Sequence, residues 1–311
     1  MIVVFGSINV DILMKVACLP RPGETVHCPS YDLIAGGKGA NQACASARAG
    51  GKVAMVGQIG RDAWGEEATG LMAGAGVNLN CVELSDKPTA CGTVWVDENA
   101  ENAIIVASGA NLTARSSQVP DEWLSPENSL VLQMEVPPEE NWSLIERAYR
   151  RGCRILLNLA PANPVPDAML DMVDVLVVNE VEALMTAKSE GLTISDQPRA
   201  LAQLLARRHG ATCIVTLGGA GACAVEADGS AWEVMALEVT AVDTTGAGDA
   251  FVGILAASLD AGASLPEGLR RASVGAALTC LEIGCQSAFP DAATIANHIE
   301  DIALPIRIDG T

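Results

Sequence analysis

The chain has 311 residues, of which half are hydrophobic and only 3% are aromatic, and it carries a formal net charge of −19 with a pI near 4.4. This acidity argues against binding to nucleic acids or anionic membranes, because contacts to phosphate groups need clustered Lys and Arg side chains. The length suits a single α/β domain over residues 1–311, with a core built from Ala, Val, Leu and Ile.

The cysteines and the N-terminal segment indicate the cellular environment of the protein. The ten cysteines include no C-x-x-C pair, and most of them lie within apolar runs. Buried, reduced thiols explain this pattern better than disulfides do, and a zinc site lacks its ligand spacing. The N-terminus has no basic segment, and no apolar run approaches the roughly 18 residues of a membrane span. We therefore expect a cytoplasmic protein without a signal peptide or a membrane helix.

Short apolar runs that end in polar or glycine residues predict the strands of a parallel sheet. Strands are expected at residues 2–5, 53–56, 130–135, 155–159, 175–178 and 213–217, with helices over 36–49, over 62–75 and after 243–249. Because parallel strands place their carboxyl ends at one edge of a sheet, the polar residues that follow them should gather there. The pattern predicts a doubly wound, mostly parallel sheet flanked by helices, with a ligand site at that edge.

Extended segments interrupt this alternation of strands and helices. Residues 12–17 alternate between apolar and polar side chains, and residues 92–96 and 103–106 have the pattern of a hairpin around a polar turn. Pro and Gly residues between 20 and 23 favour turns over helix. Together these pieces predict a small separate β-sheet, which is a candidate lid.

The segment Asp243-Thr244-Thr245-Gly246-Ala247-Gly248-Asp249 places two carboxylates around a glycine-rich turn before an apolar helix. At a helix N-terminus the N–H groups of residues 246–248 should be unpaired, and together with the helix dipole they favour an anion. Asp249 would lie in the first helical turn, where it could accept the proton of an attacking hydroxyl. This arrangement suits phosphoryl transfer to a hydroxyl. A simple helix cap explains the same residues equally well.

Two further groups of polar residues could contact a sugar. Asn9 and Asp11 follow the first strand, where they could bind hydroxyl groups or simply form a turn. The segment Gly36-Gly37-Lys38-Gly39-Ala40-Asn41 opens a helix, where Lys38 and Asn41 present a cation and an amide. Its glycines also suit close packing of the helix start on a strand, and the residues alone do not separate the two interpretations.

Two other pairs could contact a nucleotide. Asn179 and Glu182 are three residues apart and share one face of a helix start, where their oxygens suit water-mediated Mg²⁺ binding near phosphates. Acidic residues at that position also complement the helix dipole without binding anything. Thr216 and Gly218 end a strand, where a hydroxyl and an N–H could meet a phosphate.

Taken together, these segments resemble the ribokinase-like (PfkB) family of carbohydrate kinases over nearly the whole chain. The resemblance rests on Gly6-Ser7-Ile8-Asn9-Val10-Asp11, Pro22-Gly23-Glu24-Thr25, Gly36 to Ala43, Asn158 to Ala162, Asn179 to Glu182, Thr216-Leu217-Gly218 and Asp243 to Asp249. The Gly-Gly-Lys-Gly-Ala-Asn and Asp-Thr-x-Gly-Ala-Gly-Asp motifs occur in this order, about two hundred residues apart. This combination makes the resemblance specific.

The resemblance implies an ATP-dependent kinase in which Asp249 is the general base and the N–H groups of Gly246, Ala247 and Gly248 form the anion hole for the γ-phosphate. The residues implied to bind the sugar, besides Asp249, are Asn9, Asp11, Gly37, Lys38, Asn41 and Glu135. Those implied to bind ATP are Asn179, Glu182, Thr216, Gly218, Gly248 and Ser273, with Mg²⁺ carried mainly by phosphates and water. An activating K⁺ would lie near Asp243, Thr245, Thr279, Glu282, Gly284 and Ala288.

Three residues of the implied binding sites depart from the family pattern. Ser273 stands where related kinases have an asparagine near the adenine, and Ala288 stands where they have a serine beside the cation. Glu282 adds an acidic residue to the cation loop, which leaves activation by K⁺ open. The strands around 12–17, 30–35 and 92–107 resemble those that close over the sugar and pair two subunits, so the resemblance implies a homodimer joined through the lid.

The implied reaction is transfer of the γ-phosphate to the primary hydroxyl of a furanose sugar, most simply D-ribose at O5. Deoxyribose, a hexose derivative or a nucleoside are alternative acceptors, although nucleosides usually need aromatic stacking and the chain has only two Tyr and three Phe. A non-catalytic sugar-binding regulator is disfavoured because Asp249 and the glycines beside it are present. A nicotinamide dehydrogenase is disfavoured because the first strand lacks a G-x-G-x-x-G turn.

Overall fold

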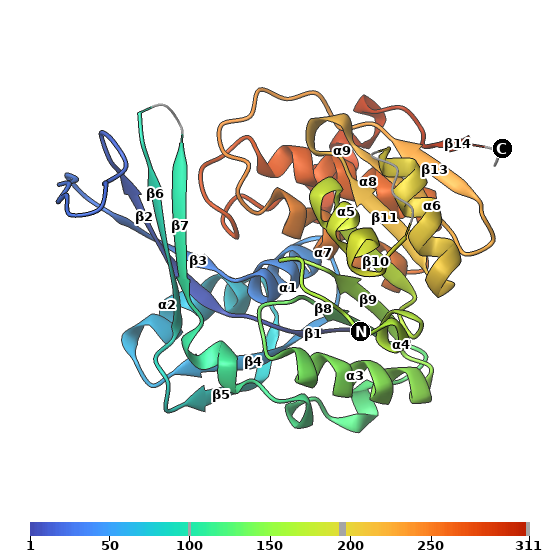
Figure 1. The fold of residues 1–311 in the computed structure, drawn as a ribbon, viewed down its shortest axis with the longest axis horizontal. Coiled ribbons are helices and arrows are strands. Elements are labelled where there is room, and N and C mark those ends of the chain that lie inside the picture. The colour runs from blue at the N-terminus through green and yellow to red at the C-terminus, as the bar shows by residue number, and fades with distance from the viewer. Residues whose placement is uncertain (99–100, 193–196, 309–311) are drawn as a thin grey trace.

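The computed structural model describes residues 1–98, 101–192 and 197–308, and its centre is a ten-stranded sheet (Figure 1). Across the sheet the strand order is β14-β13-β12-β11-β10-β9-β8-β1-β4-β5. The strands are β1 (Ile2–Phe5), β4 (Val53–Gly60), β5 (Asn78–Ser85), β8 (Ser129–Leu132), β9 (Arg154–Asn158), β10 (Val175–Asn179), β11 (Thr212–Thr216), β12 (Ala222–Val225), β13 (Ala231–Val234) and β14 (Ile306–Ile308). Neighbouring strands from β5 to β11 are parallel, and β12, β13 and β14 extend the sheet antiparallel. The predicted mostly parallel sheet is confirmed.

Helices cover both faces of this sheet because its central strands are apolar on both sides. Ile2 and Val4 of β1 pack in one buried cluster, and Val3 and Phe5 pack in the other. The first face is covered by α1 (Lys38–Arg48), α2 (Ala63–Gly74), α7 (Ala247–Asp260), α8 (Leu265–Thr279) and α9 (Ala292–His298). The second is covered by α3 (Pro138–Arg151), α4 (Asp167–Leu170), α5 (Glu180–Ser189) and α6 (Pro198–His209). Burial on both faces explains why the strands are continuous apolar runs. No helix in the described part of the chain is long and apolar enough to cross a membrane.

The position of β1 fixes where the chain changes direction across the sheet. β1 pairs with β4 on one side and with β8 on the other. The chain builds outward from β1 through β4 to β5, then returns to β8 and builds outward through β9 and β10 to β11. A topological switch point therefore lies between β1 and β8, and in open α/β sheets ligands bind at the carboxyl ends of the strands there.

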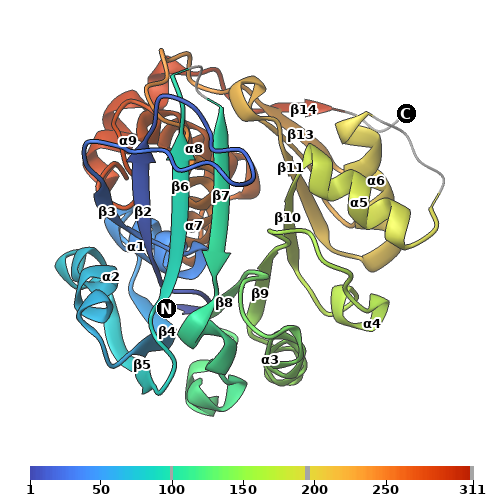
Figure 2. The ribbon, with the colours of Figure 1, turned by 60° about the vertical axis from the view of Figure 1, so that its left-hand side comes forward.

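A separate four-stranded sheet projects on the side away from α5 and α6 (Figure 1). Its order is β3 (Asp32–Gly36), β2 (Asn9–Lys15), β6 (Ala90–Val96) and β7 (Asn102–Ala107). Figure 2 shows β2, β6 and β7 side by side, apart from β8 to β11 of the main sheet. The pair β2–β6 is parallel, whereas β2–β3 and β6–β7 are antiparallel. The segments expected at 12–17, 30–35 and 92–107 overlap these strands, but residues 99–100 of the last lie outside the described residues.

Several boundaries differ from the sequence prediction. β2 begins at Asn9, so Asn9 and Asp11 belong to the small sheet and not to a turn after β1. β8 ends at Leu132 because the carbonyl of Gln133 accepts a hydrogen bond from the Asn141 side chain at 2.7 Å, which leaves Glu135 beyond the strand. β4 continues four residues past its predicted end, and β5 and the antiparallel strands β12, β13 and β14 of the main sheet were not predicted.

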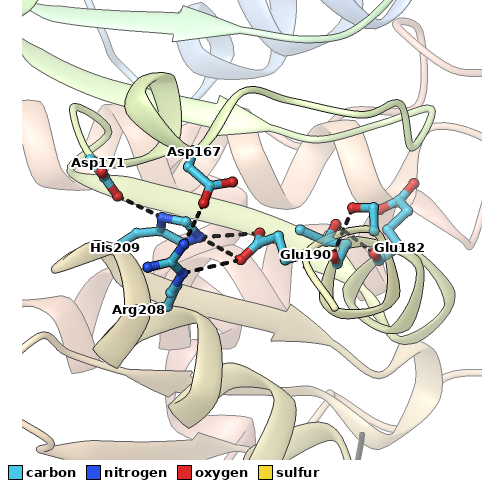
Figure 3. Close-up of polar contacts among 8 residues, drawn as sticks. Asp167, Asp171, Glu182, Glu190, Arg208 and His209 are labelled. Carbon is cyan, nitrogen blue, oxygen red and sulfur yellow. Dashed lines mark hydrogen bonds and ion pairs between the residues drawn. The ribbon is translucent and has the colours of Figure 1, made fainter. Parts of the chain in front are cut away.

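A cluster of ionisable side chains ties α4, α5 and α6 together (Figure 3). The His209 side chain at the end of α6 is 1% exposed, with Nδ1 2.8 Å from Asp171 Oδ1 and Nε2 3.0 Å from Glu190 Oε2. Arg208 contacts Asp167 of α4, and its Nε lies 3.9 Å from Glu190 Oε2. The cluster fixes the C-terminal end of α5, whose N-terminal end faces the switch-point edge of the sheet.

Candidate active site

The N-terminus of α7 provides free backbone donors. Gly246, its N-cap, has φ +78°, and a Cβ on this residue would lie 2.1 Å from Cys285 Sγ, so both conformation and space require glycine. Among described residues, the N–H groups of Gly246 and Gly248 have no hydrogen-bond partner. The Ala247 N–H donates to the Thr244 carbonyl at 3.3 Å. Two of the three predicted free donors are therefore free, and the third closes the turn.

Asp249 lies in the first turn of α7, is 7% exposed, and does not cap its own helix. Its Oδ2 accepts a hydrogen bond from Asn41 Nδ2, and its Oδ1 accepts one from Gln42 Nε2, both at 2.9 Å. The cap interpretation is therefore wrong, because the carboxylate is held by α1 beside the free donors of α7. Gln42 was not predicted, and its only sequence signal is a polar side chain within a run of small apolar residues.

Glu135 connects the switch point to the start of α1. Its Oε2 accepts hydrogen bonds from Ser7 Oγ at 2.6 Å and from the Lys38 N–H at 3.0 Å. Gly37, with φ +88°, is the N-cap of α1, and a Cβ there would lie 2.9 Å from the Ser7 carbonyl oxygen. The glycines of this segment thus allow close backbone packing, and the same packing brings Lys38 and Asn41 into the site.

Lys38 carries a positive charge at the centre of these residues. The carboxylates of Asp249, Glu135 and Glu182 raise the pKa of Lys38 and outweigh its burial, with Asp249 contributing most. These carboxylates come from α7, from the segment after β8 and from α5, so the ammonium lies within electrostatic range of all three. Lys38 therefore stays charged at neutral pH.

Asp11 lies between two glycines of the small sheet. A Cβ on Gly36 of β3 or on Gly92 of β6 would lie 2.2 Å from an Asp11 carboxylate oxygen, so these positions leave room for the carboxylate. Burial, with the charge of Glu135, raises the pKa of Asp11 from its ordinary value to about 6, although a hydrogen bond from the Gly92 backbone opposes the shift. A desolvated carboxylate at this place is a ready acceptor for hydroxyl groups.

Asn9 is held by a residue that the sequence did not reveal. Asn9 is 4% exposed, and its Oδ1 accepts a hydrogen bond from Asn111 Nδ2 at 2.8 Å. Asn111 Oδ1 accepts in turn from the Ile8 N–H at 3.0 Å. This orientation fixes the Asn9 amide so that its NH₂ group remains available as a donor.

A cavity of about 990 Å³ lies beside the free N–H groups of α7. It is lined by five of the residues predicted to bind the nucleotide, namely Asn179, Thr216, Gly218, Gly248 and Ser273. Glu182 does not line it. Ser273 Oγ donates to the Met235 carbonyl at 2.8 Å, so this hydroxyl is already engaged. The structure thus places most of the predicted nucleotide residues around one cavity.

Asn179 and Glu182 form a reciprocal helix cap at the start of α5. The Glu182 N–H donates to Asn179 Oδ1 and the Asn179 N–H donates to Glu182 Oε2, both at 2.8 Å. Burial raises the pKa of Glu182, with partial opposition from the Asn179 hydrogen bond and Lys38. This reciprocal cap was not predicted, and it engages Asn179 Oδ1 and Glu182 Oε2. Glu182 Oε1 has no hydrogen-bond partner among the described residues, which fits a water-mediated contact to Mg²⁺.

Asp243 joins the two segments predicted to hold a monovalent cation. Its Oδ1 accepts from the Thr245 N–H and hydroxyl at 2.9 and 2.7 Å, and its Oδ2 accepts from the Gly284 N–H at 3.1 Å. Burial raises the pKa of Asp243, but these hydrogen bonds outweigh it and the pKa is lowered. The Glu282 side chain is exposed, and Thr279 Oγ1 donates to the Gly275 carbonyl.

The atoms that could bind a cation in these segments are backbone carbonyl oxygens. Within the described ranges, no residue donates a hydrogen bond to the carbonyls of Thr245, Thr279, Gly284 or Ala288. No group of three or more His, Cys, Asp or Glu side chains in the described chain could hold a metal ion. Carbonyl oxygens without donors fit a weakly charged hard cation better than a transition metal.

Comparison with known proteins shows the family to which the chain belongs. Residues 1–292 match the pfkB family of carbohydrate kinases, so the chain belongs to this family. It is 35% identical over 300 residues to a ribokinase of Schizosaccharomyces pombe, covering 93% of this chain and 94% of that one. It is 33% identical over 293 residues to a deoxyribokinase of Salmonella typhi, covering 93% and 95%. The structure of Arabidopsis thaliana ribokinase complexed with ribose and ATP matches with a TM-score of 0.86 at 28% identity, covering 96% and 98%. The predicted family, fold and enzyme class are confirmed.

Proposed function

We propose that this carbohydrate kinase transfers the γ-phosphate of ATP to the primary hydroxyl of D-ribose. The observation that carries the proposal is the position of the Asp249 carboxylate beside two free N–H groups at the start of α7. Similarity to ribokinases over most of the chain, and to a ribokinase complexed with ribose and ATP, supports the choice of substrates. Deoxyribose is the second candidate acceptor, because a deoxyribokinase is nearly as similar.

In the proposed mechanism, Asp249 takes the proton from the primary hydroxyl as its oxygen attacks the γ-phosphorus, and the bond to the β-phosphate oxygen breaks to release ADP. The N–H groups of Gly246 and Gly248 stabilise negative charge on the transferred group, with Ala247 joining them if its weak turn bond opens. Lys38 adds a positive charge close to Asp249. Mg²⁺ bound to the phosphates would neutralise part of their charge.

We assign the remaining sugar contacts to the small sheet and the switch point. Asp11 and Glu135 accept hydrogen bonds from sugar hydroxyls, and Asn9 donates through its oriented NH₂ group. Gly37 lets the sugar approach the start of α1, and Asn41 contacts it beside Asp249. Because Asn9 and Asp11 lie on β2, the small sheet supplies part of the sugar site and is proposed to act as its lid.

The nucleotide is assigned to the cavity beside α7. In this assignment Asn179, Thr216 and Gly218 contact the phosphates of ATP. Gly248 contacts the γ-phosphate, and Ser273 lies near the adenine. Glu182 would hold Mg²⁺ through water by its unpaired oxygen. K⁺ would be held by the free carbonyls of Thr245, Thr279, Gly284 and Ala288, together with Asp243 and the nearby Glu282. Its binding would stabilise the loop that precedes α7.

We also propose that two copies pair through the small sheet. Apolar side chains on or beside its strands are exposed, namely Tyr31, Leu33, Ile104, Ile105 and Val106. Such a sheet has open edges and apolar surface that a second copy could cover. Sedimentation at micromolar protein should therefore show a species of twice 32.1 kDa, and a single 32.1 kDa species would contradict the pairing.

The proposed function is tested by measuring ADP release with MgATP over a panel of sugars and nucleosides, each with and without K⁺. We expect turnover with D-ribose, and a fall in kcat of roughly 10²–10⁴-fold in Asp249→Asn, which is the effect of losing a positioned general base. Turnover with deoxyribose alone would keep the mechanism and change the acceptor. The absence of ADP release with every acceptor in the panel would overturn the proposal.

A further inference from the structure

The two oxygens of Asp249 are held by a set of buried amides that extends well beyond the site. Gln42 Nε2 donates to Oδ1 and Asn41 Nδ2 donates to Oδ2. Behind them, Gln133 Nε2 donates to Gln42 Oε1 at 2.7 Å, and Gln286 Nε2 donates to Asn41 Oδ1 at 3.2 Å. Each carboxylate oxygen is therefore contacted by one amide that a second amide orients.

The direction of these hydrogen bonds is fixed by chemistry. An ionised carboxylate can only accept, so Gln42 and Asn41 must turn their NH₂ groups toward Asp249. Their carbonyl oxygens then point away, and only a hydrogen-bond donor can satisfy them. Gln133 and Gln286 supply those groups, so every amide of the set is oriented for an acceptor at Asp249.

The amides come from three segments and are held in place from outside the set. Gln42 is on α1, Gln133 follows β8, and Gln286 lies in the segment after α8. Gln42 Nε2 also donates to Asn158 Oδ1 at 2.9 Å at the end of β9. All three glutamines are 0% exposed, so their rotation is limited by packing.

Two amide oxygens of this set lack hydrogen-bond partners, which is unfavourable in a network that only supports the fold. Gln133 Oε1 and Gln286 Oε1 are buried and have no hydrogen-bond partner within the described chain. An unsatisfied buried polar group costs about 1–3 kcal/mol. The amides that carry this cost are the two that orient the contacts to Asp249, which indicates a function for that orientation.

We propose that Gln42, oriented by Gln133, is a positioning residue that holds Asp249 in the geometry for proton transfer. The inference rests on the proposed role of Asp249 as general base. Gln42 contacts Asp249 and is 0% exposed, so a bound substrate is not expected to reach it, and we expect it to act on kcat and not on sugar binding. Gln133 contacts only Gln42 among these side chains, so its effect must pass through Gln42.

The test compares Gln42→Met and Gln133→Met with wild type in the ADP-release assay at saturating ATP. Methionine keeps the side-chain length but cannot donate to a carboxylate. Because a small misplacement of a catalytic group can cost on the order of 10²-fold, we expect kcat to fall by roughly 10–100-fold in Gln42→Met and by a smaller factor in Gln133→Met. The sugar KM should change by less than about threefold.

Two comparisons separate positioning from loss of structure. Gln118→Met removes another buried glutamine, whose Nε2 donates to the Gly57 carbonyl at 3.0 Å and does not contact Asp249. This variant should lower thermal stability while keeping kcat. In the Asp249→Asn background, adding Gln42→Met should change the residual kcat by less than about twofold, because the base is already absent.

The outcomes distinguish the two proposals. If the wild type is active, two results would overturn the positioning role alone. One is a normal kcat in Gln42→Met, and the other is an equal fold loss in kcat when Gln42→Met is added to wild type and to Asp249→Asn. Inactive wild type over the whole panel would overturn the proposed function and the positioning role with it.

Discussion

Replacement of Asp11 by Asn should stabilise the protein while removing part of the proposed sugar site. Burial beside Glu135 raises the pKa of Asp11 from 3.8 to about 6. The folded state therefore binds this proton more tightly than the unfolded chain, so the associated stability is complete below pH 3.8 and is lost as the pH rises through about 6. At pH 8 the ionised carboxylate is a cost to the fold that Asn does not carry.

The size of the effect follows from the shift. A difference of about two pKa units corresponds to about 3 kcal/mol, and because Asp11 keeps some contact with water we expect Asp11→Asn to raise the free energy of unfolding by about 1–3 kcal/mol at pH 8. At pH 3.5 Asp11 is neutral in the folded state and mostly protonated in the unfolded chain, so the difference should nearly vanish. Urea unfolding of both proteins at the two pH values measures this directly.

A matched change at Asp243 should act in the opposite direction. Hydrogen bonds from Thr245 and Gly284 outweigh burial there and lower the pKa of Asp243, so its ionised form stabilises the fold at neutral pH. Asp243→Asn should therefore destabilise the protein at pH 8. If Asp11→Asn were also destabilising at pH 8, or equally stabilising at both pH values, the argument from burial would be refuted.

The pKa of Asp11 also predicts that kcat/KM for the sugar falls as the pH drops below about 6, because the protonated carboxyl accepts hydroxyl hydrogens poorly; a flat profile from pH 5 to 8 would contradict this. Gly246→Ala should lower both kcat and the melting temperature, whereas Gly262→Ala, with a similar φ of +85° but no atom within 4 Å of the added Cβ, should show only the strain of about 1 kcal/mol. His209→Ala should cost about 1–3 kcal/mol in urea unfolding, because it leaves the buried Glu190 carboxylate without its closest hydrogen-bond partner; a loss below about 1 kcal/mol would show that water or Arg208 replaces the imidazole.

The sequence by itself determined the parallel centre of the main sheet and pointed to Asp249 as the candidate base. The apolar runs at residues 2–5 and 175–178 are buried on both faces, and that requirement is visible in the residues because a strand between two helix layers has no polar side. The segment 243–249 predicts a helix start with a carboxylate and free donors because glycine, dipole and first-turn position are local properties. The position of Asn179 at the start of a helix could also be predicted from the local sequence.

Only the tertiary structure decided which side chains contact one another. Asp249 is held by Asn41 and Gln42, which are 208 and 207 residues away, and Gln133 reaches Gln42 over 91 residues. Asn111 orients Asn9 from 102 residues away. These contacts depend on the order of strands across the sheet, since β1 and β8 are neighbours only because the chain returns to the switch point after β5. Local sequence sets which groups can donate or accept, but the packing of α1 against α7 selects the partner that each of them finds.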